Sequence, residues 1–143
     1  MNITFQQSHR ILLANALLLI FVSIVLMVGV IPSVKAEFLR GGTPEKAVIA
    51  FWVNMGFNVL SAVVVILIAI KSKHRTWIST SVLVMTGFIV FLLGLALSDA
   101  AAAYSGHGPA METASIFLFI CAGVDVLTGI LLIVTAIIRP KML

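Results

Sequence analysis

Residues 113–138 read TASIFLFICAGVDVLTGILLIVTAII, an apolar run interrupted by one charged residue, Asp125. A helix needs about 20 residues to cross the roughly 30 Å of hydrocarbon in a bilayer, so this run is long enough to span it. Because a backbone in lipid must satisfy its own hydrogen bonds, we expect a helix. The run therefore predicts a transmembrane helix with an ionisable side chain near its middle.

Three further apolar runs are long enough to cross a membrane, at about 11–31, 47–70 and 78–97, and none contains a charged residue. The alternating segments of about ten residues that mark a transmembrane β-barrel are absent. Short connections make sequential helices antiparallel neighbours. With no internal repeat visible, the sequence predicts one all-α domain over residues 1–143, a four-helix transmembrane bundle.

The segments that flank the runs predict where the helices end. We expect Ile31-Pro32-Ser33 to end the first helix, because proline removes a hydrogen bond and its ring collides with the preceding turn. Residues 99–104 (DAAAAY) follow the third run and are expected to extend that helix beyond the membrane.

The composition excludes several classes of protein. Of the 143 residues, 62% are hydrophobic and 10% are charged, whereas soluble domains carry about 25% charge. A soluble enzyme, a disordered chain and a nucleic-acid-binding domain are therefore excluded. The net charge of +4 requires no nucleic acid partner, since basic residues bracketing the spans favour membrane insertion. We expect an integral, multi-pass membrane protein, and the sequence does not distinguish plasma membrane from vesicle membrane.

Basic residues are distributed unequally between the two ends of the predicted bundle. Three basic residues lie at the end that holds the first and third connections: Lys35, Arg40 and Lys46. Four acidic residues lie at the same end. Six basic residues lie at the end that holds both termini and the second connection: Arg10, Lys71, Lys73, Arg75, Arg139 and Lys141. The positive-inside rule then predicts that both termini are cytoplasmic.

The second connection has two open interpretations. Lys71, Lys73 and Arg75 could attract anionic lipid headgroups, at about 1 kcal/mol per basic residue. The same charges could equally serve only to orient the chain.

The first run also has two interpretations. Arg10, the apolar stretch and Val34-Lys35-Ala36 are similar to a secretory signal with a small-residue cleavage site. The run of about 20 residues is longer than the usual 7–15 of such a signal, which favours a retained span.

Polar residues inside the predicted spans are the candidate functional residues. An ionisable group in mid-membrane is costly and is by default a functional-site hypothesis, so Asp125 is the first candidate. Asn54, Asn58 and Ser61 share one face of the second span, and Thr86 is predicted to lie at similar depth in the third. These residues form either a proton or cation relay or a polar clasp that holds the helices together.

Small residues at helical spacing predict where helices approach closely. They are found in the third and fourth spans: Gly87, Gly94, Ser98, Gly123 and Gly129. Such residues let helix backbones meet, within one bundle or between copies of the chain.

Motifs for catalysis are missing from the sequence. There is no nucleophile elbow, no phosphate-binding glycine loop and no pair of carboxylates for acid–base chemistry. His107 stands alone between glycines, whereas a metal site needs several ligands. We therefore expect no enzyme, no cofactor, no metal and no catalytic residue.

The chain resembles the MARVEL-domain proteins, a four-span family. The resemblance lies in Ala114, the segment Ser115-Ile116-Phe117-Leu118-Phe119 and Asp125 of the fourth run, and in the Ala-rich segment 99–104. Gly123-Val124 stand where that family usually has a tyrosine. The resemblance implies a role in vesicle trafficking, membrane apposition or subdomain assembly, with Asp125 as a structural residue.

Two functions are compatible with the sequence. The first is a non-enzymatic scaffold that organises a membrane subdomain, membrane traffic or a larger complex through contacts with lipids and with another membrane protein or itself. The alternative is a small transporter or channel subunit that uses Asp125 with Asn54 and Asn58.

Overall fold

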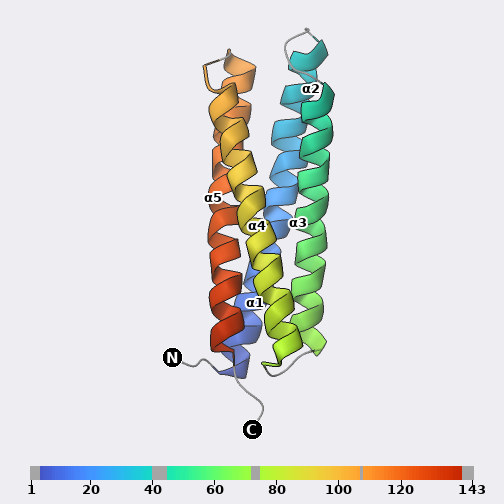
Figure 1. Cartoon of the computed structure of the whole chain (residues 1–143). Helices are drawn as coiled ribbons and strands as arrows, with labels where there is room; N and C mark the ends of the chain where they lie inside the picture. Colours follow the sequence, from blue (N-terminus) through green and yellow to red (C-terminus); the bar gives the residue numbers. More distant parts are fainter. Residues whose placement is uncertain (1–3, 40–44, 72–74, 107, 140–143) are drawn as a thin grey trace.

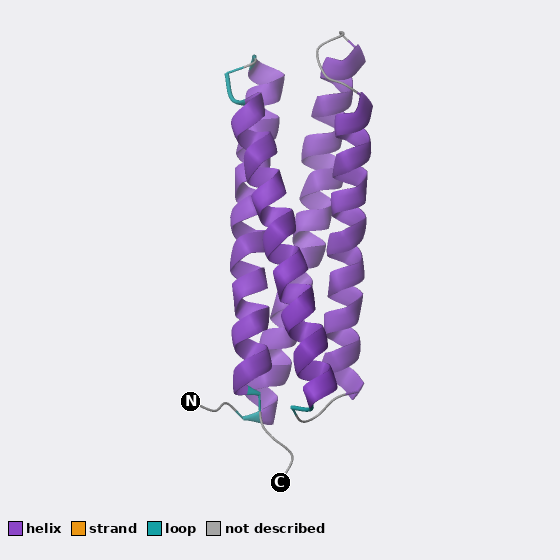
Figure 2. Ribbon diagram, in the orientation of Figure 1, coloured by secondary structure: helices purple, strands orange, loops and turns teal. Residues whose placement is uncertain are grey.

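The computed structural model describes residues 4–39, 45–71, 75–106 and 108–139. Every regular element in these ranges is helical (Figure 2). In chain order they are α1 (Phe5–Val25), the π-helical turn η1 (Leu26–Val30), α2 (Ile31–Leu39), α3 (Glu45–Lys71), α4 (Trp77–Tyr104) and α5 (Pro109–Ile138). The prediction of an all-α four-helix bundle is confirmed.

Four helical segments are long and apolar enough to cross a membrane: Gln6–Lys35, Val48–Lys71, Trp77–Tyr104 and Met111–Ile138. The protein is therefore an integral, multi-pass membrane protein. The start of α1 and the end of α5 lie at the same end of the bundle (Figure 1), as an even number of spans requires.

The prediction that Pro32 ends the first helix is wrong. α1, η1 and α2 form one continuous rod, and Pro32 lies inside α2. Immediately before it, the chain widens into a π-turn in which the Ile31 N–H donates to the Leu26 carbonyl. Such a turn gives the proline ring room where a regular helix would have placed a carbonyl. The Ser33 hydroxyl donates to the Gly29 carbonyl at 3.1 Å and so gives a partner to an acceptor within the π-turn.

The other helix ends follow local sequence rules. Thr4 caps α1 and Thr76 caps α4, each through a reciprocal capping box with the residue three positions on. Residues 99–104 extend α4, as the sequence predicts. Gly108, with φ +105°, directly precedes α5, which begins with proline in its first turn.

The four spans form a ring that follows chain order, so sequential helices are neighbours, as the sequence predicts (Figure 1). α5 packs along α4 on one side and along the first rod on the other, and α1 packs against α3. α3 and α4 close the ring with a looser contact. Among the described residues no Cα atoms of α3 and α5 lie within 8 Å of one another. These two helices are therefore diagonal, and only their side chains can meet in the middle.

Glycines set the tightest of these contacts, between α4 and α5. A Cβ added to Gly87 would lie 2.7 Å from the Gly129 carbonyl oxygen, and one added to Gly94 would lie 2.9 Å from the Val126 backbone nitrogen. Only glycine permits this approach.

Gly129→Ala is expected to lower the free energy of unfolding by on the order of 1–3 kcal/mol through overpacking. Its new Cβ would lie 2.6 Å from the Gly87 carbonyl oxygen and 2.8 Å from the Phe91 backbone nitrogen. Backbone atoms cannot turn aside as a side chain can, so the helices must separate. Unfolding in detergent micelles measures the effect. Gly56→Ala on α3 is the matched control, because nothing lies within 4 Å of its added carbon. Equal stability of the two variants would contradict this packing.

Candidate functional site

Asp125 is completely buried in α5. Asn58, on the diagonal helix α3, is equally buried, and its amide faces the Asp125 carboxyl across the bundle interior. Their geometry falls short of a hydrogen bond: within the described part of the chain, neither carboxylate oxygen of Asp125 has a partner. The structure thus brings together the two residues that the sequence singled out in mid-membrane.

Contacts between helices show which other side chains lie near this depth. The Cys121 sulfur contacts the Val22 carbonyl oxygen at 4.0 Å. α1 and α5 are antiparallel, so a step of seven residues forward along α5 and seven residues back along α1 leads from this contact to Thr128 and Asn15. These two residues therefore lie at the same depth. Asn54 Nδ2 donates to the Leu93 carbonyl at 3.4 Å, and the same seven-residue step along α3 and α4 brings Ser61 level with Thr86.

All four spans therefore contribute buried polar side chains to one zone about two helical turns deep. Each of these side chains is at most 8% exposed. We call this set the polar layer: Asn15, Asn54, Asn58, Ser61, Thr86, Asp125 and Thr128.

Hydrogen bonds satisfy part of the polar layer. Asn58 Nδ2 donates to the Asn54 carbonyl at 3.0 Å and to Asn54 Oδ1 at 2.8 Å. The Thr86 hydroxyl donates to the Val82 carbonyl at 2.7 Å. Several buried atoms of the layer have no partner among the described residues: Asn15 Nδ2, Asn58 Oδ1, both Asp125 oxygens and Thr128 Oγ1.

Sequence reasoning missed two members of this layer as site residues, Asn15 and Thr128. Thr128 could have been found, since it lies three residues after Asp125 and so nearly shares its helix face. Asn15 could not, because its depth depends on the register between α1 and α5.

The predicted packing residues divide into two groups. Gly87, Gly94 and Gly129 lie in the α4–α5 contact. Gly123 takes no part in it: the residue is exposed, and nothing lies within 4 Å of a Cβ added there. Ser98 is half-buried at the edge of the same contact.

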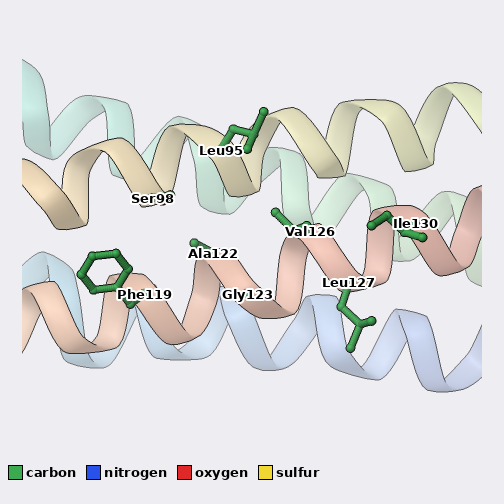
Figure 3. A pocket seen from close by; sticks show the side chains of 8 residues that line it. All are labelled: Leu95, Ser98, Phe119, Ala122, Gly123, Val126, Leu127 and Ile130. Carbon is green, nitrogen blue, oxygen red and sulfur yellow. The ribbon is translucent and has the colours of Figure 1, made fainter.

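Gly123 and Ser98 instead line a groove on the outer face of α4 and α5 (Figure 3). The groove has a volume of about 410 Å³. Small residues form part of its lining, and larger apolar side chains complete it: Leu95, Phe119, Val126, Leu127 and Ile130. We call it the outer groove.

Two of the three basic residues of the second connection, Lys71 and Arg75, lie in the described part of the chain. Lys71 is exposed at the end of α3, and Lys73 lies outside the described residues. Arg75 Nη1 donates to the Ile137 carbonyl and so ties the start of α4 to the end of α5. Arg139 is buried at that same end, and burial lowers the pKa of its guanidinium below the ordinary value.

The described residues contain no group of three or more His, Cys, Asp or Glu side chains that could hold a metal ion. What the polar layer offers is one carboxyl surrounded by neutral amides and hydroxyls. Such a set can hold a proton, a water molecule or a monovalent ion, and it can hold helices together.

Comparison with known proteins identifies no relative, because no family description, no curated protein and no solved structure matches the chain.

Asn54→Leu is expected to destabilise the bundle by about 0.6–2 kcal/mol, the range for interhelical hydrogen bonds in membranes. The substitution removes the side-chain acceptor of Asn58 and the link to the Leu93 carbonyl. Thr113→Val is the control, since Thr113 only bonds within its own helix at an exposed position. Thermal unfolding in detergent measures the stability of both variants. An Asn54→Leu variant as stable as the wild-type protein would show that the Asn54 hydrogen bonds do not stabilise the bundle.

Proposed function

We propose that this chain is a non-enzymatic membrane protein that organises a membrane subdomain or a larger membrane complex, with the outer groove as its docking face. The occupant proposed is a transmembrane helix of another membrane protein. The observation that carries the proposal is Gly123, a mid-span glycine whose open side is covered by no described residue.

The physics of helix association in lipid supports a docking role. Lipid tails are as apolar as leucine, so burying apolar side chains gives two helices no advantage over staying in lipid. Association depends instead on close packing, for which small residues at the contact are needed. Ser98, Ala122 and Gly123 supply such a lining, with Leu95 and Phe119 beside it. The groove holds no charged residue, which suits a partner within the hydrocarbon.

The resemblance to MARVEL-domain proteins supports the same role and extends it to vesicle trafficking or membrane apposition. In this proposal the partners are membrane lipids and another membrane protein, with self-association as a further outcome of the test. Neither a cofactor nor a nucleic acid is required.

Gly123→Leu is expected to reduce partner capture at least tenfold, because its side chain fills the outer groove without touching the bundle core. The measurement is chemical cross-linking in intact native membranes, followed by purification in mild detergent and mass spectrometry. Gly56→Leu is the matched control. It is also exposed and mid-span, with nothing within 4 Å of its added Cβ, but it lies on α3 away from the groove.

A defined membrane partner lost with Gly123→Leu and kept with Gly56→Leu is the result that the proposal requires. If both variants keep the partner, the outer groove is not the docking face. If the wild-type protein is recovered alone, the organising role is wrong.

A second candidate is a small transporter or channel subunit that uses Asp125 with Asn54 and Asn58. It is favoured by the unpartnered Asp125 oxygens and by a hollow of about 170 Å³ between α3 and α4. That hollow has Asn54 in its lining and extends to Tyr104, so it offers a route from the bundle end toward the polar layer.

For this candidate, Asp125→Asn is expected to reduce proton or sodium flux into proteoliposomes at least tenfold, because the amide carries no exchangeable charge. Asp99→Asn, at an exposed position on α4, should conduct like the wild-type protein. Absence of flux from the wild-type protein, measured with entrapped ion-sensitive dyes, would eliminate transport.

A further inference from the structure

The unpartnered atoms of the polar layer are nearly all of one chemical kind. Within the described residues, four of them are oxygens from three side chains: both carboxylate oxygens of Asp125, Asn58 Oδ1 and Thr128 Oγ1. All four can accept a hydrogen bond, and the Thr128 hydroxyl can also donate one. Each belongs to a side chain with 0% exposure. Asn15 Nδ2, level with Thr128, is a donor and can satisfy at most one or two of them.

Two of the side chains that could donate are already committed elsewhere. Asn58 Nδ2 donates to the Asn54 carbonyl and to Asn54 Oδ1, and Asn58 Oδ1 has no partner among the described residues. The Thr86 hydroxyl gives its proton to Val82. Each buried acceptor without a partner costs about 1–3 kcal/mol. A cation coordinated by these oxygens would therefore stabilise the layer.

No basic side chain supplies that positive charge. The described Lys, Arg and His residues all lie near helix ends, and the closest along the chain to Asn15 is Arg10. Arg10 precedes Asn15 by five residues, which is roughly 7 Å along the axis of α1 at 1.5 Å per residue. Its side chain is exposed. His9, one residue earlier, makes a hydrogen bond to the Ala69 carbonyl oxygen at 3.0 Å. The carboxyl of Asp125 therefore faces only neutral groups.

We propose that Asp125, Asn58 and Thr128 bind one small monovalent cation, with Na⁺ as the ion that fits their chemistry. All the available ligand atoms are oxygens, which hard cations prefer. One carboxylate neutralises one positive charge, so the loaded site is neutral, whereas a divalent ion would leave a net charge buried at a cost of several kcal/mol. A sodium ion can contact several of the oxygens at once.

A proton on Asp125 is the alternative occupant. Its O–H could donate to Asn58 Oδ1, while the Thr128 hydroxyl and the Asn15 amide could donate to the remaining carboxyl oxygen. The site does not depend on the outer groove. It deepens the second candidate function, but binding is tested below without any transport, so the two can fail separately.

The test is the thermal unfolding of the purified full-length protein in NaCl and in choline chloride at equal ionic strength and pH. Sodium is expected to raise Tm by roughly 3–6 °C with saturation, the shift that occupancy well above Kd gives a domain of this size. Asp99→Asn should show the same sodium-dependent shift as the wild-type protein, because Asp99 is exposed on α4. Asp125→Asn should show none.

Thr128→Val keeps the shape of the side chain and removes one ligand, so it should weaken the sodium concentration dependence at least fivefold. It also serves as the test if Asp125→Asn does not fold. The proposal is overturned if the wild-type Tm is the same in sodium and choline, or if Asp125→Asn keeps the sodium shift. A Tm that responds to pH but not to sodium would likewise overturn it, in favour of a protonated Asp125.

Discussion

The hydrocarbon of a bilayer offers no hydrogen bonds, and the rest of this structure follows from that constraint. It makes the backbone helical in all four spans. It also favours polar side chains that turn inward in mid-span, where Asp125, Asn58 and Thr128 all have 0% exposure. The apolar side chains that face outward need no such partner. A buried layer of polar groups inside an apolar bundle is the outcome.

The close contact of α4 with α5 determines how that layer is built. Gly87 and Gly129 bring the two backbones together, while α3 is left diagonal to α5. Asn58 and Asp125 then meet across an interior that no backbone crosses. Some oxygens of this layer remain without partners among the described residues, and these are the atoms proposed to bind a cation.

Apolar run length predicts the four spans and the all-α class, because the bilayer imposes both. Features that depend on neighbouring helices are not predictable in this way. Pro32 is expected to end a helix, but the π-turn before it lets the helix continue. Gly123 and Gly129 look equivalent in sequence, yet six residues place them about 120° apart around α5, one facing the outer groove and one facing α4. Asn15 joins the polar layer only through the register of α1 against α5.

The register between α1 and α5 assembles the polar layer, and the single cysteine of the chain provides a test of it. The Cys121 sulfur lies 4.0 Å from the Val22 carbonyl oxygen, and Val22 is buried whereas its neighbour Phe21 is 47% exposed. In oxidised native membranes, Val22→Cys should form an intrachain disulfide with Cys121, and Phe21→Cys should not. A disulfide from Phe21→Cys, or none from Val22→Cys, would contradict the alignment that assembles the polar layer.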